Sequence, residues 1–69
     1  MKLKELFAVE KITKDHLVNM ADESSYWDTA SDFILNNWEV DVNFLSEKQI
    51  QWAHKILEDM TERRIENRL

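Results

Sequence analysis

The 69-residue chain contains no cysteine, no glycine and no proline. Without cysteine it has neither a disulfide framework nor a thiolate metal site, which excludes the small disulfide-rich secreted class and favours a cytoplasmic location. Without glycine it has no phosphate-cradling loop of the nucleotide-binding kinds. Tight β-hairpins also rely on glycine for positive φ, so a multistranded sheet is disfavoured. Together these absences predict an all-α protein.

Long apolar runs and catalytic patterns are missing as well. No stretch approaches the roughly 20 apolar residues that cross a bilayer, so no membrane partner is expected. His54 and Glu58 share a helix face, but no further metal ligands follow at a recognised spacing. Asp15, Asp22 and Glu23 do not fit a calcium loop, which requires glycine. We therefore expect no enzymatic activity, no cofactor and no metal site.

The residues that are present indicate helices, most clearly at the C-terminal end. Ser46-Glu47-Lys48-Gln49 is a capping box, in which the first and last side chains bond each other's backbone N–H groups. Leu45 and Ile50 flank the cap as a hydrophobic staple. A helix is expected from about residue 47 to about residue 66, because apolar residues then recur at three- and four-residue spacing.

A middle helix is expected over residues 26–37. Ser25 is its predicted N-cap, and Asp28 favours the positive end of the helix dipole. Asn36-Asn37 is its predicted end, because asparagine tolerates the left-handed conformation that stops a helix. The expected buried stripe consists of Trp27, Ala30, Phe33 and Ile34, extended by Trp38.

The N-terminal third predicts two shorter helices. Thr13 can cap one over residues 14–21, with Ile12 and Leu17 as its staple. Residues 2–10 predict another, and residues 38–44 alternate apolar and acidic side chains as an extended linker without a partner strand. The expected fold is a single domain over residues 1–69, a small bundle of three or four short helices with the longest helix C-terminal.

Charge is distributed unevenly along this acidic chain, whose net charge is −5. Every charged residue from position 15 to position 47 is acidic: Asp15, Asp22, Glu23, Asp28, Asp32, Glu39, Asp41 and Glu47. Such a segment is a solvated face, a docking surface for a basic protein or a weak cation site. Nucleic acid is disfavoured as a partner, because phosphate binding uses clustered Lys and Arg, although the basic residues near the two ends can form a modest patch.

Three Trp, three Phe and one Tyr are a large aromatic content for this length, and most are expected in the core. Trp52 lies off the apolar line of its helix, and Tyr26 opens its helix beside Trp27, so these two rings are the expected exposed anchors. The predicted partner-binding residues are Tyr26, Asp28, Asp32, Glu39, Asp41 and Trp52. A two-fold homodimer is a further possibility, because it covers apolar surface that a thin core leaves exposed.

Part of the chain resembles a helix–linker–helix pattern of small bacteriophage-encoded accessory proteins. The residues concerned are Phe33-Ile34-Leu35, Phe44-Leu45-Ser46-Glu47-Lys48-Gln49, Trp52 and Lys55-Ile56, about half of the chain. The resemblance implies a viral protein that acts in the host cytoplasm on a host or phage nucleic-acid-processing protein. The functional hypothesis is a non-enzymatic protein-binding module. The alternatives are a nucleic-acid-associated protein, with Trp52 for stacking, and a structural homo-oligomer.

Overall fold

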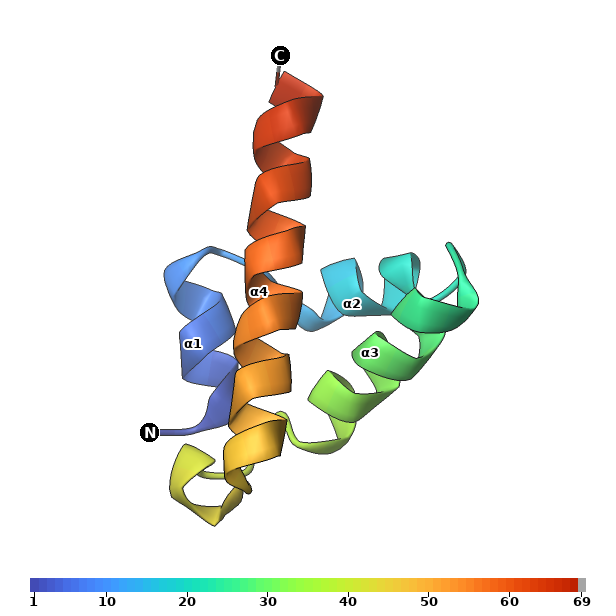
Figure 1. Cartoon of the computed structure of the whole chain (residues 1–69). Helices are drawn as coiled ribbons and strands as arrows, with labels where there is room; N and C mark the ends of the chain where they lie inside the picture. Colours follow the sequence, from blue (N-terminus) through green and yellow to red (C-terminus); the bar gives the residue numbers. More distant parts are fainter. Residues whose placement is uncertain (69) are drawn as a thin grey trace.

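The computed structural model describes the backbone of residues 1–68 and the side chains of residues 1–62. Its helices are α1 (Leu3–Val9), α2 (Lys14–Met20), α3 (Ser25–Asn36) and α4 (Glu47–Arg68), with a 3-10 turn, η1 (Val42–Phe44), before the last (Figure 1). The described backbone contains no β-strand. The predicted all-α fold with its longest helix at the C-terminal end is therefore confirmed.

Helix α4 lies in the middle of the molecule, with α1 on one side and the α2–α3 pair on the other (Figure 1). All four helices and the connecting segments contribute to one apolar core. Its buried members are Leu3, Phe7, Ile12, Leu17, Ala30, Ile34, Trp38, Leu45, Ala53, Ile56 and Met60. The core is small, so the connections that fix the short helices carry much of the structural specificity.

Helix α1 ends in a Schellman motif that has lysine where glycine usually stands. The Ile12 N–H donates to the Phe7 carbonyl at 3.0 Å, and the Lys11 N–H donates to the Ala8 carbonyl at 2.9 Å. Lys11 takes the left-handed conformation of this motif, with φ at 60°. That conformation costs a residue with a Cβ about 1–2 kcal/mol. Burial of Ile12 and Phe7 in the core stabilises the motif.

Helix α2 begins as predicted. Thr13 Oγ1 accepts from the His16 N–H at 3.4 Å, and His16 Nδ1 accepts from the Thr13 N–H at 3.0 Å. Histidine here takes the part that Glu or Gln plays in the usual capping box. The reciprocal bonds fix the direction in which the chain leaves the turn after α1, and they bring Leu17 into the core.

The middle helix ends at Asn36, with Asn37 as its C-cap, as predicted, but its predicted N-cap and the predicted conformation of its last residues need correction. Ser24, not Ser25, is the N-cap of α3, because Ser24 has the extended backbone and its Oγ accepts from the Trp27 N–H at 3.2 Å. At the other end Asn37 is not left-handed, since its φ is −112° and its ψ 14°. Its side-chain amide instead donates to the Phe33 carbonyl at 2.8 Å, which satisfies a free carbonyl of the last turn.

The linker after α3 was also predicted incorrectly, because it does have a partner. The Leu3 N–H donates to the Val40 carbonyl at 2.9 Å, and the Val42 N–H donates to the Met1 carbonyl at 2.8 Å. These bonds flank an isolated antiparallel bridge between the start of the chain and the linker. The linker then turns into η1 and does not stay extended. A local alternation of residue types carries no information about a partner forty residues away.

The start of α4 follows the prediction closely. The Ser46 N–H donates to Gln49 Oε1 at 2.8 Å, and the Gln49 N–H donates to Ser46 Oγ at 3.2 Å. Leu45 is buried and Ile50 is half-buried, as a hydrophobic staple requires. The capping box therefore sets both the first residue of α4 and the direction from which the chain enters this helix.

Candidate functional site: an acidic helix face, an aromatic seam and a lysine-rimmed pocket

The six predicted partner-binding residues fall into three separate places. Asp28 and Asp32 lie on the outward face of α3, and Tyr26 and Trp52 lie where α3 meets α4. Glu39 and Asp41 lie beyond the end of α3, beside the N-terminal segment. The structure therefore brings these residues together in pairs and does not gather them into one surface.

Asp28 and Asp32 form an exposed acidic face on α3. They are one helical turn apart and lie on the side of the helix away from its buried residues, Ala30 and Ile34. Asp32 Oδ2 accepts from Asn36 Nδ2 at 3.3 Å, and among the described residues neither aspartate forms a salt bridge. Two like charges at this spacing destabilise a helix by a few tenths of a kcal/mol. The presence of two aspartates at this spacing is therefore not explained by the stability of α3.

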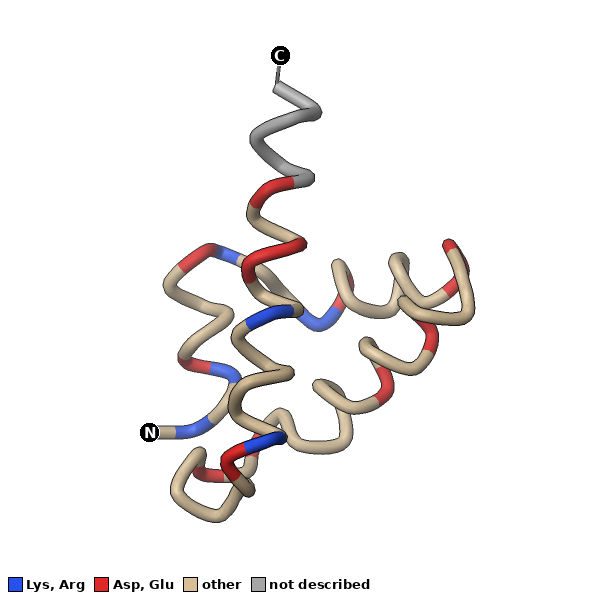
Figure 2. Tube along the Cα trace, viewed as in Figure 1, with Lys and Arg blue, Asp and Glu red and all other residues tan. Residues whose placement is uncertain are grey.

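After Lys14, the first residue of α2, all charged residues of α2 and α3 are acidic. Figure 2 shows acidic positions along α3 and at the turn before it, while the basic positions lie at the start of the chain and of α1, in the turn after α1, at the start of α2 and on α4. Lys14 is the basic residue that opens α2, and no other basic residue follows before Lys48. Residues 15–36 therefore present a negative potential, and Lys14 at the start of α2 is the one Lys or Arg on these two helices.

The aromatic residues between α3 and α4 form a seam made of Tyr26, Trp27, Phe33 and Trp52. Phe33 stacks on Trp52 with centroids 4.5 Å apart and ring planes 19° apart. Tyr26 meets Trp27 edge to face, with centroids 5.1 Å apart. Trp52 is half-buried, since the Phe33 ring covers one of its faces. Tyr26 stays 43% exposed and is the most accessible ring of the seam.

Asp59 closes the seam at the end nearer the start of α3. Its Oδ2 accepts from the Tyr26 hydroxyl at 3.5 Å, and its Oδ1 pairs with Lys55 Nζ at 3.3 Å. The hydrogen bond that Lys55 donates to Asp59 raises the pKa of Lys55 above its ordinary value, and the carboxylate charge adds to this. The Tyr26 ring is therefore held by its hydroxyl end and leaves much of its apolar body in solvent.

Glu39 and Asp41 are engaged inside the molecule. Glu39 accepts from Lys4 Nζ at 2.9 Å and from Lys2 Nζ at 3.4 Å, and the Lys4 hydrogen bond is the main reason that the Glu39 pKa is lowered. The pKa of Asp41 is lowered chiefly by the Asn43 N–H and then by the Met1 ammonium group, 3.1 Å away. These two carboxylates tie the linker to the start of the chain, which the one-sided charge pattern of residues 15–47 did not predict.

Phe44 is an exposed aromatic residue that the sequence did not single out. Its ring is 84% exposed at the end of η1, although the alternation of residues 38–44 places it in phase with apolar neighbours. The core position goes to Leu45 because that residue precedes the Ser46 cap and packs as its staple. The position of each residue relative to the Ser46 cap is the sequence signal that distinguishes the buried Leu45 from the exposed Phe44.

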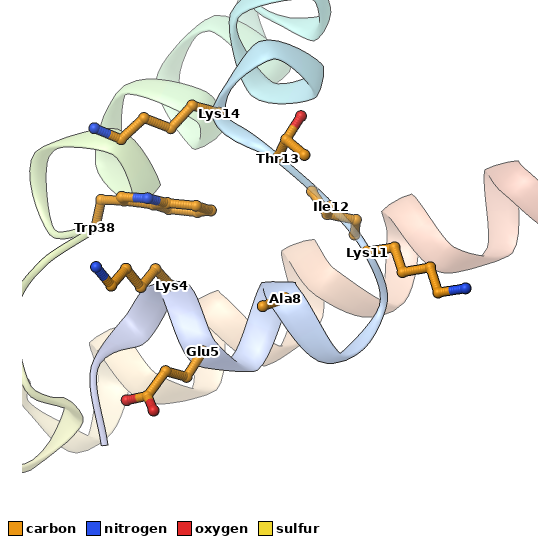
Figure 3. Close-up of a pocket in the computed structure, with 8 residues that line it drawn as sticks. All are labelled: Lys4, Glu5, Ala8, Lys11, Ile12, Thr13, Lys14 and Trp38. Carbon is orange, nitrogen blue, oxygen red and sulfur yellow. The ribbon is translucent and has the colours of Figure 1, made fainter.

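A pocket of about 500 Å³ lies between α1, the turn into α2 and Trp38 (Figure 3). Its lining consists of Lys4, Glu5, Ala8, Lys11, Ile12, Thr13, Lys14 and Trp38. The sequence did not identify this site because three separate segments contribute to it. Trp38 was expected only as core, and the N-terminal lysines only as a weak patch together with the C-terminal arginines, whose side chains lie outside the described residues.

Comparison with protein-family profiles, with curated proteins and with solved structures finds no match to this chain. Among the described residues, no three His, Asp or Glu side chains gather as metal ligands would. Of the helices described, none combines the length and the apolar character needed to cross a bilayer. The functional argument therefore rests on the acidic face, the seam and the pocket themselves.

Proposed function

We propose that this chain is a non-enzymatic protein-binding module that docks a basic partner on α3 and the adjoining edge of α4. The observation that carries the proposal is that Asp28 and Asp32, which form no salt bridge with any described side chain, lie on the same helix as the 43% exposed Tyr26. Carboxylates without an internal salt bridge attract a basic surface, and a fixed aromatic ring supplies desolvated contact area at low entropy cost.

Each group has a separate part in the proposed complex. Asp28 and Asp32 act at long range, raise the association rate and lose their effect as salt screens them. Tyr26 acts on contact, because its hydroxyl is already bonded to Asp59 and its ring needs little further ordering. Trp52 stacks on Phe33 and so helps to fix the side of α3 that faces α4. Glu39 and Asp41 have internal partners and contribute less.

The wider role we propose is that of a small accessory protein, of the kind bacteriophages encode, acting in the host cytoplasm. Its partner is a basic, nucleic-acid-processing protein of the host or the phage. The acidic residues that follow one another without a cation from Asp15 to Glu47 support this choice, because surfaces that bind nucleic acid carry clustered Lys and Arg. An acidic module occupies such a surface by charge complementarity.

The test is quantitative capture from a lysate of the source organism by immobilised protein. Wild type is compared with the Asp28→Asn/Asp32→Asn double variant, with Tyr26→Ala, and with Glu58→Gln/Glu62→Gln as a control with the same charge change on α4. We expect a basic protein whose recovery falls at least about tenfold with the first two variants, survives the control, and declines with added salt.

Two results would overturn the proposal. One is a captured protein whose recovery is equal for wild type and the double aspartate variant. The other is binding to a second copy of this chain alone, seen as a dimer by light scattering and unaffected by the Asp28→Asn/Asp32→Asn change, with no basic protein retained.

A further inference from the structure

We propose that the pocket between α1, the turn into α2 and Trp38 binds a small aromatic phosphate of the size of a mononucleotide. The site is distinct from the α3 face, shares none of its residues and does not depend on the docking proposal. Its volume of about 500 Å³ lies within the range of small-molecule sites, which is roughly 300–1,000 Å³.

The floor of the pocket is apolar and fixed. Ile12 and Trp38 are almost fully buried but present an edge to the pocket, and Ala8 is exposed beside them. The Trp38 ring is held from behind by Phe7, with centroids 5.9 Å apart at a tilt of 48°. A flat ring packed against this floor gains apolar contact without rearranging the core.

The charged residues that line the pocket are three lysines and Glu5. In Figure 3 the ammonium group of Lys14 lies above the Trp38 indole and that of Lys4 lies below it, whereas Lys11 points away. Among the described side chains, none forms an ion pair with Lys14. Lysine commonly binds phosphate as a point charge, so a phosphate at the rim can pair with Lys14 on one side of the indole or with Lys4 on the other.

Lys4 can serve the ligand without leaving Glu39 uncompensated. Lys4 Nζ lies 2.9 Å from Glu39, but Lys2 Nζ also reaches that carboxylate at 3.4 Å. An ammonium group has three donors, so Lys4 can keep its bond to Glu39 and direct another N–H to the phosphate. Without ligand, the ion pair with Glu39 keeps Lys4 near the mouth of the pocket.

The pocket wall is preorganised by the two caps that meet there. The left-handed Lys11 completes the Schellman motif of α1, and two residues later Thr13 and His16 form the box that starts α2. The backbone of this turn is thus bonded at both ends. A ligand that enters has little ordering entropy to offset, which favours binding of a small molecule.

The test follows amide and indole resonances by NMR during titration with adenosine 5′-monophosphate. We expect shifts at Ala8, at residues 12–14 and at the Trp38 indole N–H. Adenosine should bind about tenfold more weakly, and inorganic phosphate alone should leave the indole unmoved. Lys14→Ala should weaken binding about tenfold or more, while Lys48→Ala, an exposed lysine in the first turn of another helix, should leave it unchanged.

A short thymidine oligonucleotide, tested with and without a 5′-phosphate, shows whether the bound phosphate belongs to a free nucleotide or to the end of a nucleic-acid strand. Preference for the phosphorylated strand over the mononucleotide assigns a strand end, and the reverse preference assigns a free nucleotide. The proposal is overturned by equal binding of adenosine and the monophosphate. It is also overturned by equal effects of Lys14→Ala and Lys48→Ala, or by no shift at about 10 mM monophosphate.

Discussion

The Phe33 ring lies on the Trp52 ring with centroids 4.5 Å apart and planes 19° apart, and this stack joins α3 to α4. Aromatic pairs of this kind contribute about 0.5–1.5 kcal/mol beyond the area that they bury. Because both rings are half-buried, the stack is a structural joint that also borders solvent. It fixes the distance between Tyr26 on α3 and Asp59 on α4, and hence the shape of the proposed docking edge.

Replacing Trp52 with alanine should destabilise the protein by about 2–3 kcal/mol, since the change removes a stacked, half-buried ring. Urea denaturation followed by circular dichroism measures this as a lower midpoint. Phe44→Ala is the matched control and should change stability by less than about 0.5 kcal/mol, because that ring is 84% exposed. Equal losses in the two variants would contradict the stack.

Replacing Ser31 with alanine should stabilise the protein by about 1 kcal/mol. Ser31 is only 1% exposed, and its hydroxyl oxygen has no hydrogen-bond partner among the described residues. Alanine removes this unsatisfied group and is a better helix former. Ser24→Ala on the same helix should instead destabilise by about 1 kcal/mol through loss of the N-cap, whereas Ser25→Ala should be nearly neutral. Thermal or urea unfolding of the three variants decides the order.

Replacing Lys11 with glycine should raise the free energy of unfolding by about 0.5–1 kcal/mol. Glycine relieves the left-handed strain at φ 60°, and the gain is partly offset by its greater freedom in the unfolded chain. Ala8→Gly, inside α1, is the control and should destabilise by about 1 kcal/mol. A loss of stability in Lys11→Gly would mean that the lysine side chain stabilises the turn.

Acid should weaken the attachment of the linker to the start of the chain. The folded-state pKa values of Glu39 and Asp41 lie below their ordinary values of 4.5 and 3.8, so their stabilisation is present above those values. It is lost as pH falls through the lower folded-state values. The Glu39→Gln/Asp41→Asn variant should therefore be less stable than wild type at pH 6 and should approach it near pH 2. Unfolding midpoints across this range test the prediction, and a gap that widens on acidification would refute it.

Local sequence determined where α2 and α4 begin, because the capping interactions that start these helices span only four or five residues. The boxes at Thr13 and Ser46 each satisfy backbone groups within one turn, so residue identity alone places the starts of α2 and α4. The cap of α3 was misplaced by one residue because Ser24 and Ser25 are chemically equal. Only the surrounding chain decides which of them takes the extended backbone.

Tertiary structure alone decided where the charges and aromatic rings went. The sequence by itself determined an all-α chain with a long C-terminal helix and an acidic middle, because absent glycine, absent proline and helical periodicity act locally. It did not determine that Glu39 pairs with Lys4 or that Phe44 faces solvent. Nor did it place Trp38 among the N-terminal lysines. Those outcomes depend on contacts between segments some thirty residues apart, which are set by how the short helices pack against α4.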